Sequence, residues 1–270
     1  MVKLIASDMD HTLLTEKGEL PPDFANYIAR LEGIGIGFVI ASGRPLYTLE
    51  HIFSSIKNKL GFIADNGGVV NYKGETLFKS LISPATYQAM VAFIGEKTDG
   101  IAILCGLDTA FLPEEARIHE NFLRTFYANM MFVPKLDRVA AEVDKVTVYL
   151  PDKNSKACYE KIVRPWYGGD FSVTVGDTIW IDIMNHGINK GNAMRVLGDR
   201  LHIGASHMMA FGDTYNDIEM LKAVEYSYIV KNAHEDMKGF AKFITDSNDN
   251  FGVIKVIDKI LHGQKIIGRL

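Results

Sequence analysis

Short apolar runs recur along this 270-residue chain, and a polar or glycine-containing cluster closes each of them. The runs do not alternate with polar residues, which is typical of strands buried on both faces of a parallel sheet. Helical patterns separate them, so the chain predicts a doubly wound, Rossmann-like α/β sheet. The expected strands are 4–6, 37–41, 62–64, 208–211 and 226–230, and the expected helices are 22–31, 46–56, 190–201, 217–223 and 253–261.

The middle of the chain has a different pattern. A helix is expected at 85–97, and the strands expected there are 101–105, 109–112, 145–150, 172–175 and 178–183. Gly176 and Asp177, between the last two strands, are typical of a two-residue hairpin turn. We therefore expect a discontinuous α/β core at residues 1–82 and 184–270, interrupted by an inserted α+β domain at residues 83–183.

Composition excludes several classes of protein. A formal net charge of −4 gives no electrostatic footprint for nucleic acid or for an anionic membrane. No apolar stretch approaches a membrane span, and the first residues lack the pattern of a secretory signal. Cys105 and Cys158 lie outside any C-x-x-C motif, so we expect two buried, reduced thiols. A cytoplasmic location is the default expectation.

Asp8 follows the first expected strand, and Asp10 lies two residues further along. Ligands of open α/β sheets bind at the carboxyl ends of the strands, and residues two apart in extended chain point the same way. One carboxylate could attack phosphorus, and the other could protonate the leaving oxygen and later activate water. Taken alone, this acidic pair is equally compatible with an Asx turn that closes a strand.

A second acidic cluster, with Asp213 and Asp217, closes the strand expected at 208–211. Mg²⁺ prefers oxygen ligands, and Asp213 together with Asp8 could supply them. Asp217 could hold a metal-bound water or orient the other groups. The alternative is a capped helix N-terminus, which explains one acid better than the whole cluster.

Two further segments offer groups that bind phosphate. Ser42, Gly43 and Arg44 follow a strand and open a helix, so a hydroxyl, backbone N–H groups and a guanidinium could form a phosphate cradle. Lys190 begins another helix, where a cation opposes the helix dipole unless it binds an anion such as phosphate or Asp8. The alternatives are an ordinary capped helix and a solvated surface lysine.

The order of these segments resembles that of the haloacid dehalogenase superfamily of phosphohydrolases over the whole chain. The resemblance rests on Asp8-Met9-Asp10-His11-Thr12, Ala41-Ser42-Gly43-Arg44-Pro45, Lys190, and Gly212-Asp213-Thr214-Tyr215-Asn216-Asp217. The insert resembles a type IIB cap. Residues 65–68 and 244–253 are similar to the Cof-type subgroup, and Cys105-Gly106-Leu107 is similar to its bacterial sugar phosphatases.

The resemblance implies roles for individual residues. Asp8 would be the nucleophile and a Mg²⁺ ligand, and Asp10 the general acid/base that also binds the metal through its backbone carbonyl. Ser42 and Lys190 would bind the phosphoryl group that is transferred. Asp213 would be a Mg²⁺ ligand, and Asp217 would support the metal site. Three residues would lie near the substrate phosphate: Gly43, Arg44 and Asn216. The family usually has Gly directly after Asp10, where this chain has His11.

The resulting expectation is Mg²⁺-dependent hydrolysis of small phosphate monoesters, of the sugar phosphate class, through an aspartyl phosphate. Two alternatives stay open: transfer of the phosphoryl group to another sugar, as in a mutase, and a non-catalytic sensor of phosphorylated metabolites. The expected partner is the small-molecule substrate, without nucleic acid or membrane, and the expected assembly is a monomer or weak homodimer. Trp180 and the hairpin beside it are a candidate specificity element, unless Trp180 packs in a domain core.

Overall fold

The computed structural model describes residues 1–264, and the chain divides into two compact units. The first unit comprises Met1–Ser42, Ser54–Phe78 and the chain from Asn189, and the second comprises Gly43–Phe53 and Lys79–Ile188. The predicted core range of 1–82 therefore includes a segment, Gly43–Phe53, that packs with the second unit. The interpretation of the second unit as a cap stays a prediction.

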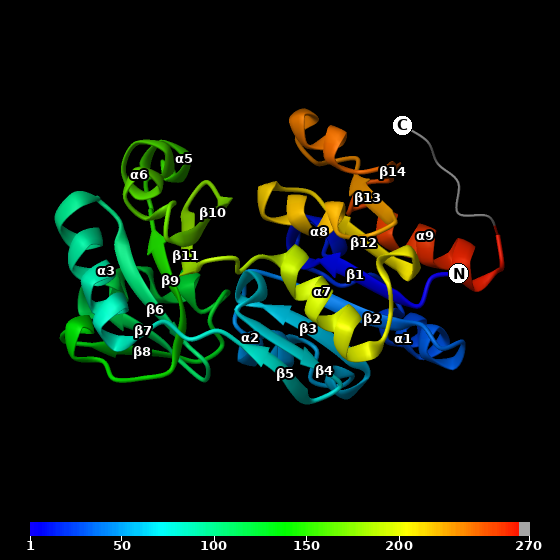
Figure 1. Ribbon diagram of the computed structural model, residues 1–270, viewed down its shortest axis with the longest axis horizontal. Coiled ribbons are helices and arrows are strands. Elements are labelled where there is room, and N and C mark those ends of the chain that lie inside the picture. Colours follow the sequence, from blue (N-terminus) through cyan, green and yellow to red (C-terminus); the bar gives the residue numbers. More distant parts are fainter. Residues whose placement is uncertain (265–270) are drawn as a thin grey trace. The chain divides into compact units, whose positions relative to one another are not determined.

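The first unit is built on an eight-stranded sheet with the order β14-β13-β12-β1-β2-β3-β4-β5 (Figure 1). Neighbouring strands from β14 to β3 are parallel, and β4 is antiparallel to β3. The strands are β1 (Leu4–Asp8), β2 (Gly37–Ala41), β3 (Leu60–Ala64), β4 (Val69–Tyr72), β5 (Glu75–Lys79), β12 (Met208–Gly212), β13 (Tyr226–Val230) and β14 (Phe243–Thr245). Because β1 lies between β12 and β2, the residues that follow these three strands share one edge of the sheet.

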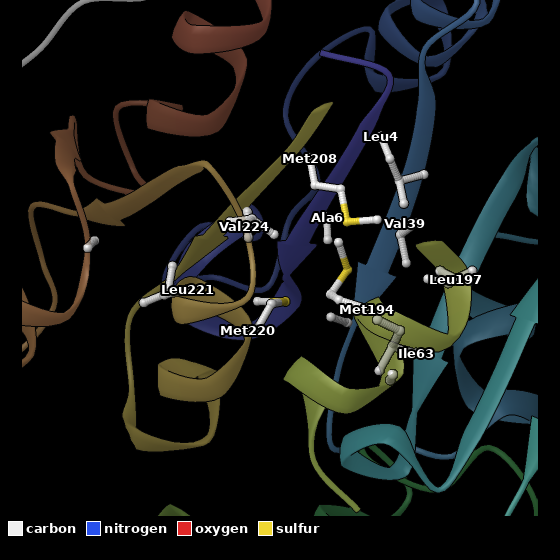
Figure 2. Close-up of a cluster of buried hydrophobic side chains, with 14 of the residues drawn as sticks. Leu4, Ala6, Val39, Ile63, Met194, Leu197, Met208, Met220, Leu221 and Val224 are labelled. Atoms are coloured by element: carbon white, nitrogen blue, oxygen red, sulfur yellow. The ribbon is translucent and has the colours of Figure 1, made fainter. Parts of the chain in front are cut away.

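Helices cover both faces of this sheet. They are α1 (Phe24–Gly33), α7 (Lys190–Leu201), α8 (Ile218–Lys222) and α9 (Gly252–Leu261). Met194 of α7 and Met220 of α8 belong to one buried apolar cluster with Ala6 and Val39 of the central strands (Figure 2). On the opposite face Phe38, the neighbour of Val39, meets Phe24 of α1 edge-on at 5.6 Å between ring centroids. Alternate residues of β2 thus serve two apolar layers, as a doubly covered parallel strand requires.

The second unit has a six-stranded sheet of order β10-β11-β9-β6-β7-β8. Its strands are β6 (Ile101–Gly106), β7 (Ala110–Pro113), β8 (Met130–Val133), β9 (Val143–Tyr149), β10 (Phe171–Asp177) and β11 (Trp180–Asn185). Its helices are α2 (Leu46–Ile52), α3 (Pro84–Lys97), α4 (Glu120–Leu123), α5 (Ser155–Cys158) and α6 (Arg164–Tyr167). One apolar cluster joins α3 to the sheet, and a second contains Trp180 with Tyr127 and Tyr149. Trp180 therefore packs in a core, which was the alternative to a specificity role.

Most expected elements are present, with two corrections. The helix expected at 46–56 ends at Ile52. The hairpin turn expected at Gly176-Asp177 is wrong by two residues: β10 continues to Asp177, which pairs with Trp180, so Thr178 and Ile179 form the turn. The strand register shifts between Val175 and Asp177, which places Gly176 at an irregularity of the strand, a common position for glycine.

Cys105 and Cys158 are buried free thiols, as expected. No helix among residues 1–264 combines the length and the apolar character needed to cross a bilayer.

Candidate active site

A buried lysine joins two of the predicted acidic residues. Lys190, the first residue of α7, places Nζ 2.5 Å from Oδ1 of Asp8 and 2.7 Å from Oδ1 of Asp217. Its side chain has no exposed surface. A lysine at the start of a helix was expected to bind an anion such as Asp8, because it opposes the helix dipole there, and the structure shows this contact. The alternative of a solvated surface lysine is wrong.

Asp217 is fully buried and holds the loop after β12 in place. Its Oδ2 accepts hydrogen bonds from the backbone N–H of Asp213, at 3.0 Å, and of Thr214, at 3.2 Å, while Oδ1 accepts from Lys190. A Cβ on Gly212 would lie 2.6 Å from the Cβ of Asp217, so this fold of the loop requires glycine there. Both Asp217 oxygens therefore serve neighbouring protein groups, which fits the predicted supporting role.

Asp213 lies beside Asp8 and is bound by a residue from the other acidic loop. Its Oδ1 accepts a hydrogen bond of 2.8 Å from Oγ1 of Thr12, which is buried. The sequence patterns included Thr12 without a role, and the structure gives it one in orienting Asp213. Asp8, Asp213 and Asp217 each offer a carboxylate oxygen within 4.8 Å of the others.

The charges of this cluster are unbalanced. Three carboxylates face the ammonium of Lys190, so their negative charge exceeds its positive charge by two when all three acids are ionised. A hard divalent cation with oxygen ligands supplies that balance, and small Mg²⁺ binds through one or two protein carboxylates. The donor set therefore fits Mg²⁺.

Burial and crowding alter the acidities of these groups in the metal-free protein. Burial, followed by the charge of Asp217, raises the pKa of Asp213 to about 7. Burial also raises the pKa of Asp8, against the opposing effect of Lys190, and the Asp217 and Asp213 charges add to the rise. For Lys190, burial alone would lower the pKa, but the Asp217 and Asp8 carboxylates outweigh it and keep the ammonium charged.

The turn after Asp8 shows why the family usually has glycine at the position of His11. Asp10 has an extended backbone, at φ −75° and ψ 129°, and is half-buried. His11 has φ 61° and ψ 1°, the left-handed conformation that glycine adopts at no steric cost. The usual glycine is therefore explained by backbone geometry, and His11 takes the same conformation at a cost.

A third loop, noted in the sequence only as a subgroup signature, connects two predicted phosphate-binding segments. The backbone N–H of Asn66 donates to the Ser42 carbonyl at 3.0 Å, and its Oδ1 accepts from Nδ2 of Asn216 at 3.0 Å. Asp65, Asn66 and Gly67 have φ values of 49°, 55° and 105°, so the chain reverses sharply after β3. Ser42 and Asn66 are both buried. An Asp-Asn-Gly run after a strand was the available signal for this connection.

Gly43 and Arg44 belong to the second unit. A guanidinium nitrogen of Arg44 donates to the Thr125 carbonyl, and the group lies over the Phe126 ring at 4.7 Å. Nζ of Lys145 donates to the Gly43 carbonyl at 2.5 Å and lies 3.5 Å from Oδ2 of Asp182. The sequence did not single out Lys145, because a lysine in a strand pattern carries no signal of burial. Phosphate binding by Gly43 and Arg44 stays a prediction.

Known proteins resemble this chain along almost its whole length. The family model of haloacid dehalogenase-like hydrolases matches residues 5–257. The 5-amino-6-(5-phospho-D-ribitylamino)uracil phosphatase YbjI of Escherichia coli strain K12 is 31% identical over 96% of this chain and 96% of its own length.

Two solved structures show the same fold. The crystal structure of SMU.1108c from Streptococcus mutans has a TM-score of 0.90 at 30% identity, and the match covers 97% of this chain and 100% of SMU.1108c. The subclass IIB sugar phosphatase BT4131 has a TM-score of 0.81 at 22% identity and covers 96% of this chain and 99% of its own. The predicted α/β class is confirmed.

Proposed function

The chain belongs to the haloacid dehalogenase-like hydrolase family as a phosphatase, and we propose that it uses Mg²⁺ to hydrolyse small phosphate monoesters through an aspartyl phosphate on Asp8. The observation that carries this proposal is the contact of the buried Lys190 ammonium with Asp8 beside Asp213. A phosphate dianion repels an approaching carboxylate, so the nucleophile needs a fixed positive charge next to it. Lys190 supplies that charge and holds the Asp8 carboxylate in one orientation.

Asp8 and Asp10 have separate tasks in this scheme. In the first step an Asp8 oxygen forms a bond to phosphorus, the bond to the leaving oxygen breaks, and Asp10 donates a proton to that oxygen. In the second step water attacks phosphorus, the bond to Asp8 breaks, and Asp10 takes a proton from the water. Ser42 and Lys190 bind the phosphoryl oxygens in both steps, and Asn216, Gly43 and Arg44 bind the substrate phosphate.

Mg²⁺ would be held by the carboxylates of Asp8 and Asp213 and by the backbone carbonyl of Asp10. When bound, it would neutralise charge on the substrate phosphate and on the two carboxylates. Asp217 supports this site indirectly, because its oxygens already bind Lys190 and the backbone at Asp213 and Thr214.

The proposed substrates are sugar phosphates and related phosphorylated polyols. The Escherichia coli relative is a phosphatase of a phosphoribityl compound, whose phosphate is carried by a polyol chain. We propose a cytoplasmic location, which suits the two free thiols, and a monomer or weak homodimer without nucleic acid or membrane partners.

A phosphate-release screen tests the proposal. Purified protein is incubated with sugar, polyol and nucleoside monophosphates, with Mg²⁺ or with EDTA, and inorganic phosphate is measured. We expect release that needs Mg²⁺ and is lost in Asp8→Asn. Turnover that survives in Asp8→Asn would remove Asp8 as the nucleophile. If an added sugar accepts the phosphoryl group in place of water, the protein is a phosphotransferase.

A further inference from the structure

The turn that carries Asp10 has a backbone conformation that its own sequence does not favour. The turn η1 (Met9–Leu13) is closed by a hydrogen bond of 2.9 Å from the Leu14 N–H to the Met9 carbonyl. Within it, His11 occupies the left-handed region at φ 61°. A non-glycine residue there is sterically strained, so the surroundings must hold the turn.

Two asparagines far along the chain bind the backbone of this turn, one at His11 and one just after the turn. Nδ2 of Asn232 donates to the His11 carbonyl at 2.8 Å, and Nδ2 of Asn248 donates to the Leu14 carbonyl at 3.0 Å. The two are joined, because the Asn248 backbone N–H donates to Oδ1 of Asn232 at 3.0 Å. Asn248 is only 1% exposed, so its hydrogen bonds are made away from water, where an unmade bond is costly.

The exposed residue Glu16 makes further contacts with this turn and with Asn248. Oε1 of Glu16 lies 3.1 Å from Nδ1 of His11 and 3.0 Å from Nδ2 of Asn248, and the Glu16 N–H donates to Asp249. Exposed ion pairs contribute little to stability, because water screens them and two mobile side chains must be ordered. The buried Asn248 therefore contributes more to holding the turn than the pairing of His11 with Glu16.

We propose that Asn248, acting directly and through Asn232, is a positioning residue for Asp10. The two asparagines fix the backbone at the reversal, on His11, and just after it, on Leu14, and this reversal sets the direction in which the preceding residue, Asp10, presents its carboxyl. The inference rests on the proposed function, in which Asp10 gives a proton to the leaving oxygen. It also gives a physical role to the 244–253 segment, which the catalytic scheme leaves without one.

The test compares two substrates that differ in their need for that proton. The leaving alkoxide of a sugar phosphate requires protonation, whereas p-nitrophenolate leaves without it. The ratio of kcat/KM for the two substrates therefore reports the general acid, because kcat/KM covers the chemistry only up to departure of the leaving group. A variant that merely loses folded protein lowers both values equally and leaves the ratio unchanged.

The variants are Asn248→Ser and Asn232→Ala, and the second removes an exposed side chain, so folding is not at risk there. Asn250→Ala is the matched control, because Asn250 lies exposed in the same segment and its Nδ2 donates to Oγ of Ser247, a residue outside the turn. We expect the sugar phosphate to lose roughly tenfold more kcat/KM than p-nitrophenyl phosphate in both test variants, a fraction of the about 10²–10⁴ that a general acid contributes. Asn250→Ala should keep the wild-type ratio.

Asp10→Asn separates the two ways in which the inference could fail. If Asp10→Asn loses the sugar phosphate selectively and the asparagine variants lose both substrates equally, the positioning role is wrong. If Asp10→Asn itself shows no selective loss, the proposed acid role of Asp10 is wrong, and the positioning inference falls with it.

Discussion

Lys190 and Asp8 form an ion pair of 2.5 Å in which the lysine side chain is completely buried. The pair joins the first residue of α7 to the last residue of β1. Burial of an ammonium is favourable only when charged partners surround it, and Asp217 provides the second partner at 2.7 Å. Removal of any one of these charges should therefore change the chemistry of the site, and removal of the Lys190 charge should also destabilise the fold.

Lys190→Met should reduce both activity and stability. Loss of the ammonium leaves Asp8 and Asp217 without a buried counter-charge, which costs about 3–5 kcal/mol when one partner of a buried pair is removed. The proposed catalytic charge is lost as well, so kcat should fall roughly 10²–10³-fold. Thermal unfolding and steady-state kinetics in saturating Mg²⁺ measure the two effects. Lys259→Met, at an exposed position of α9, is the control, and an equal effect there would contradict the assignment.

Asp8→Asn should abolish turnover without weakening the metal-free fold. Burial holds the pKa of Asp8 above its ordinary value, so the ionised carboxylate is unfavourable where it lies. A neutral amide removes that unfavourable charge, and Lys190 keeps Asp217 as a partner. We expect the Tm in EDTA to equal or exceed that of the wild type. A large drop in Tm would show that Asp8 mainly supports the fold.

Metal-free stability should fall as pH rises from 5 to 8. The pKa of Asp213 is about 7 in the folded protein against an ordinary value of 3.8, so the folded state binds the extra proton between these values. Stability therefore decreases with pH through this window. The Tm in EDTA should decline, and the rise in Tm on adding Mg²⁺ should be larger at pH 8, because metal ligands must be deprotonated. Asp213→Asn should flatten both dependences, and an unchanged slope in that variant would assign them elsewhere.

Gly212→Ala should damage the site through a single methyl group. The new Cβ would lie 2.6 Å from the Cβ of Asp217, so Asp217 or the loop must move and its hydrogen bonds to Lys190 and Asp213 must weaken. We expect lower stability and at least a roughly tenfold loss of kcat, since small displacements of catalytic groups are costly. Gly95→Ala in the exposed part of α3, where no atom lies within 4 Å, should instead stabilise by up to about 1 kcal/mol.

Much of the fold could be predicted because its signals are local. Buried parallel strands are continuous apolar runs, and α7 was expected at 190–201, the bounds that the structure gives. The strand β4 and the edge strand β5 were missed, since short partly polar strands such as Glu75–Lys79 resemble loops. The hairpin at Thr178 was misplaced because glycine favours strand irregularities as well as turns.

The candidate site divides in the same way. Which residue types follow which strands is visible in the sequence, and this brought Asp8, Asp213 and Lys190 into one hypothesis. Partners that depend on packing are not visible: the bond from Thr12 to Asp213, the link from Asn66 to Asn216 and the burial of Lys145 all involve residues distant in sequence. The catalytic and metal-binding roles stay predictions until they are tested.

The hydrogen bond between Thr12 and Asp213 spans 201 residues of sequence, and the pair of Lys190 with Asp8 spans 182. During synthesis Asp8 is therefore made long before Lys190, which pairs with it, and before Asp213, which lies beside it. A chain that has been made only as far as residue 189 has Asp8 without the lysine that pairs with it, without Asp213 beside it and without the loop that Asp217 holds in place. Because long-range contacts of this kind form late, the site is complete only after the chain has been made as far as Asp217. Phosphatase activity in this molecule is thus also a sign that the chain has been made and folded at least as far as Asp217.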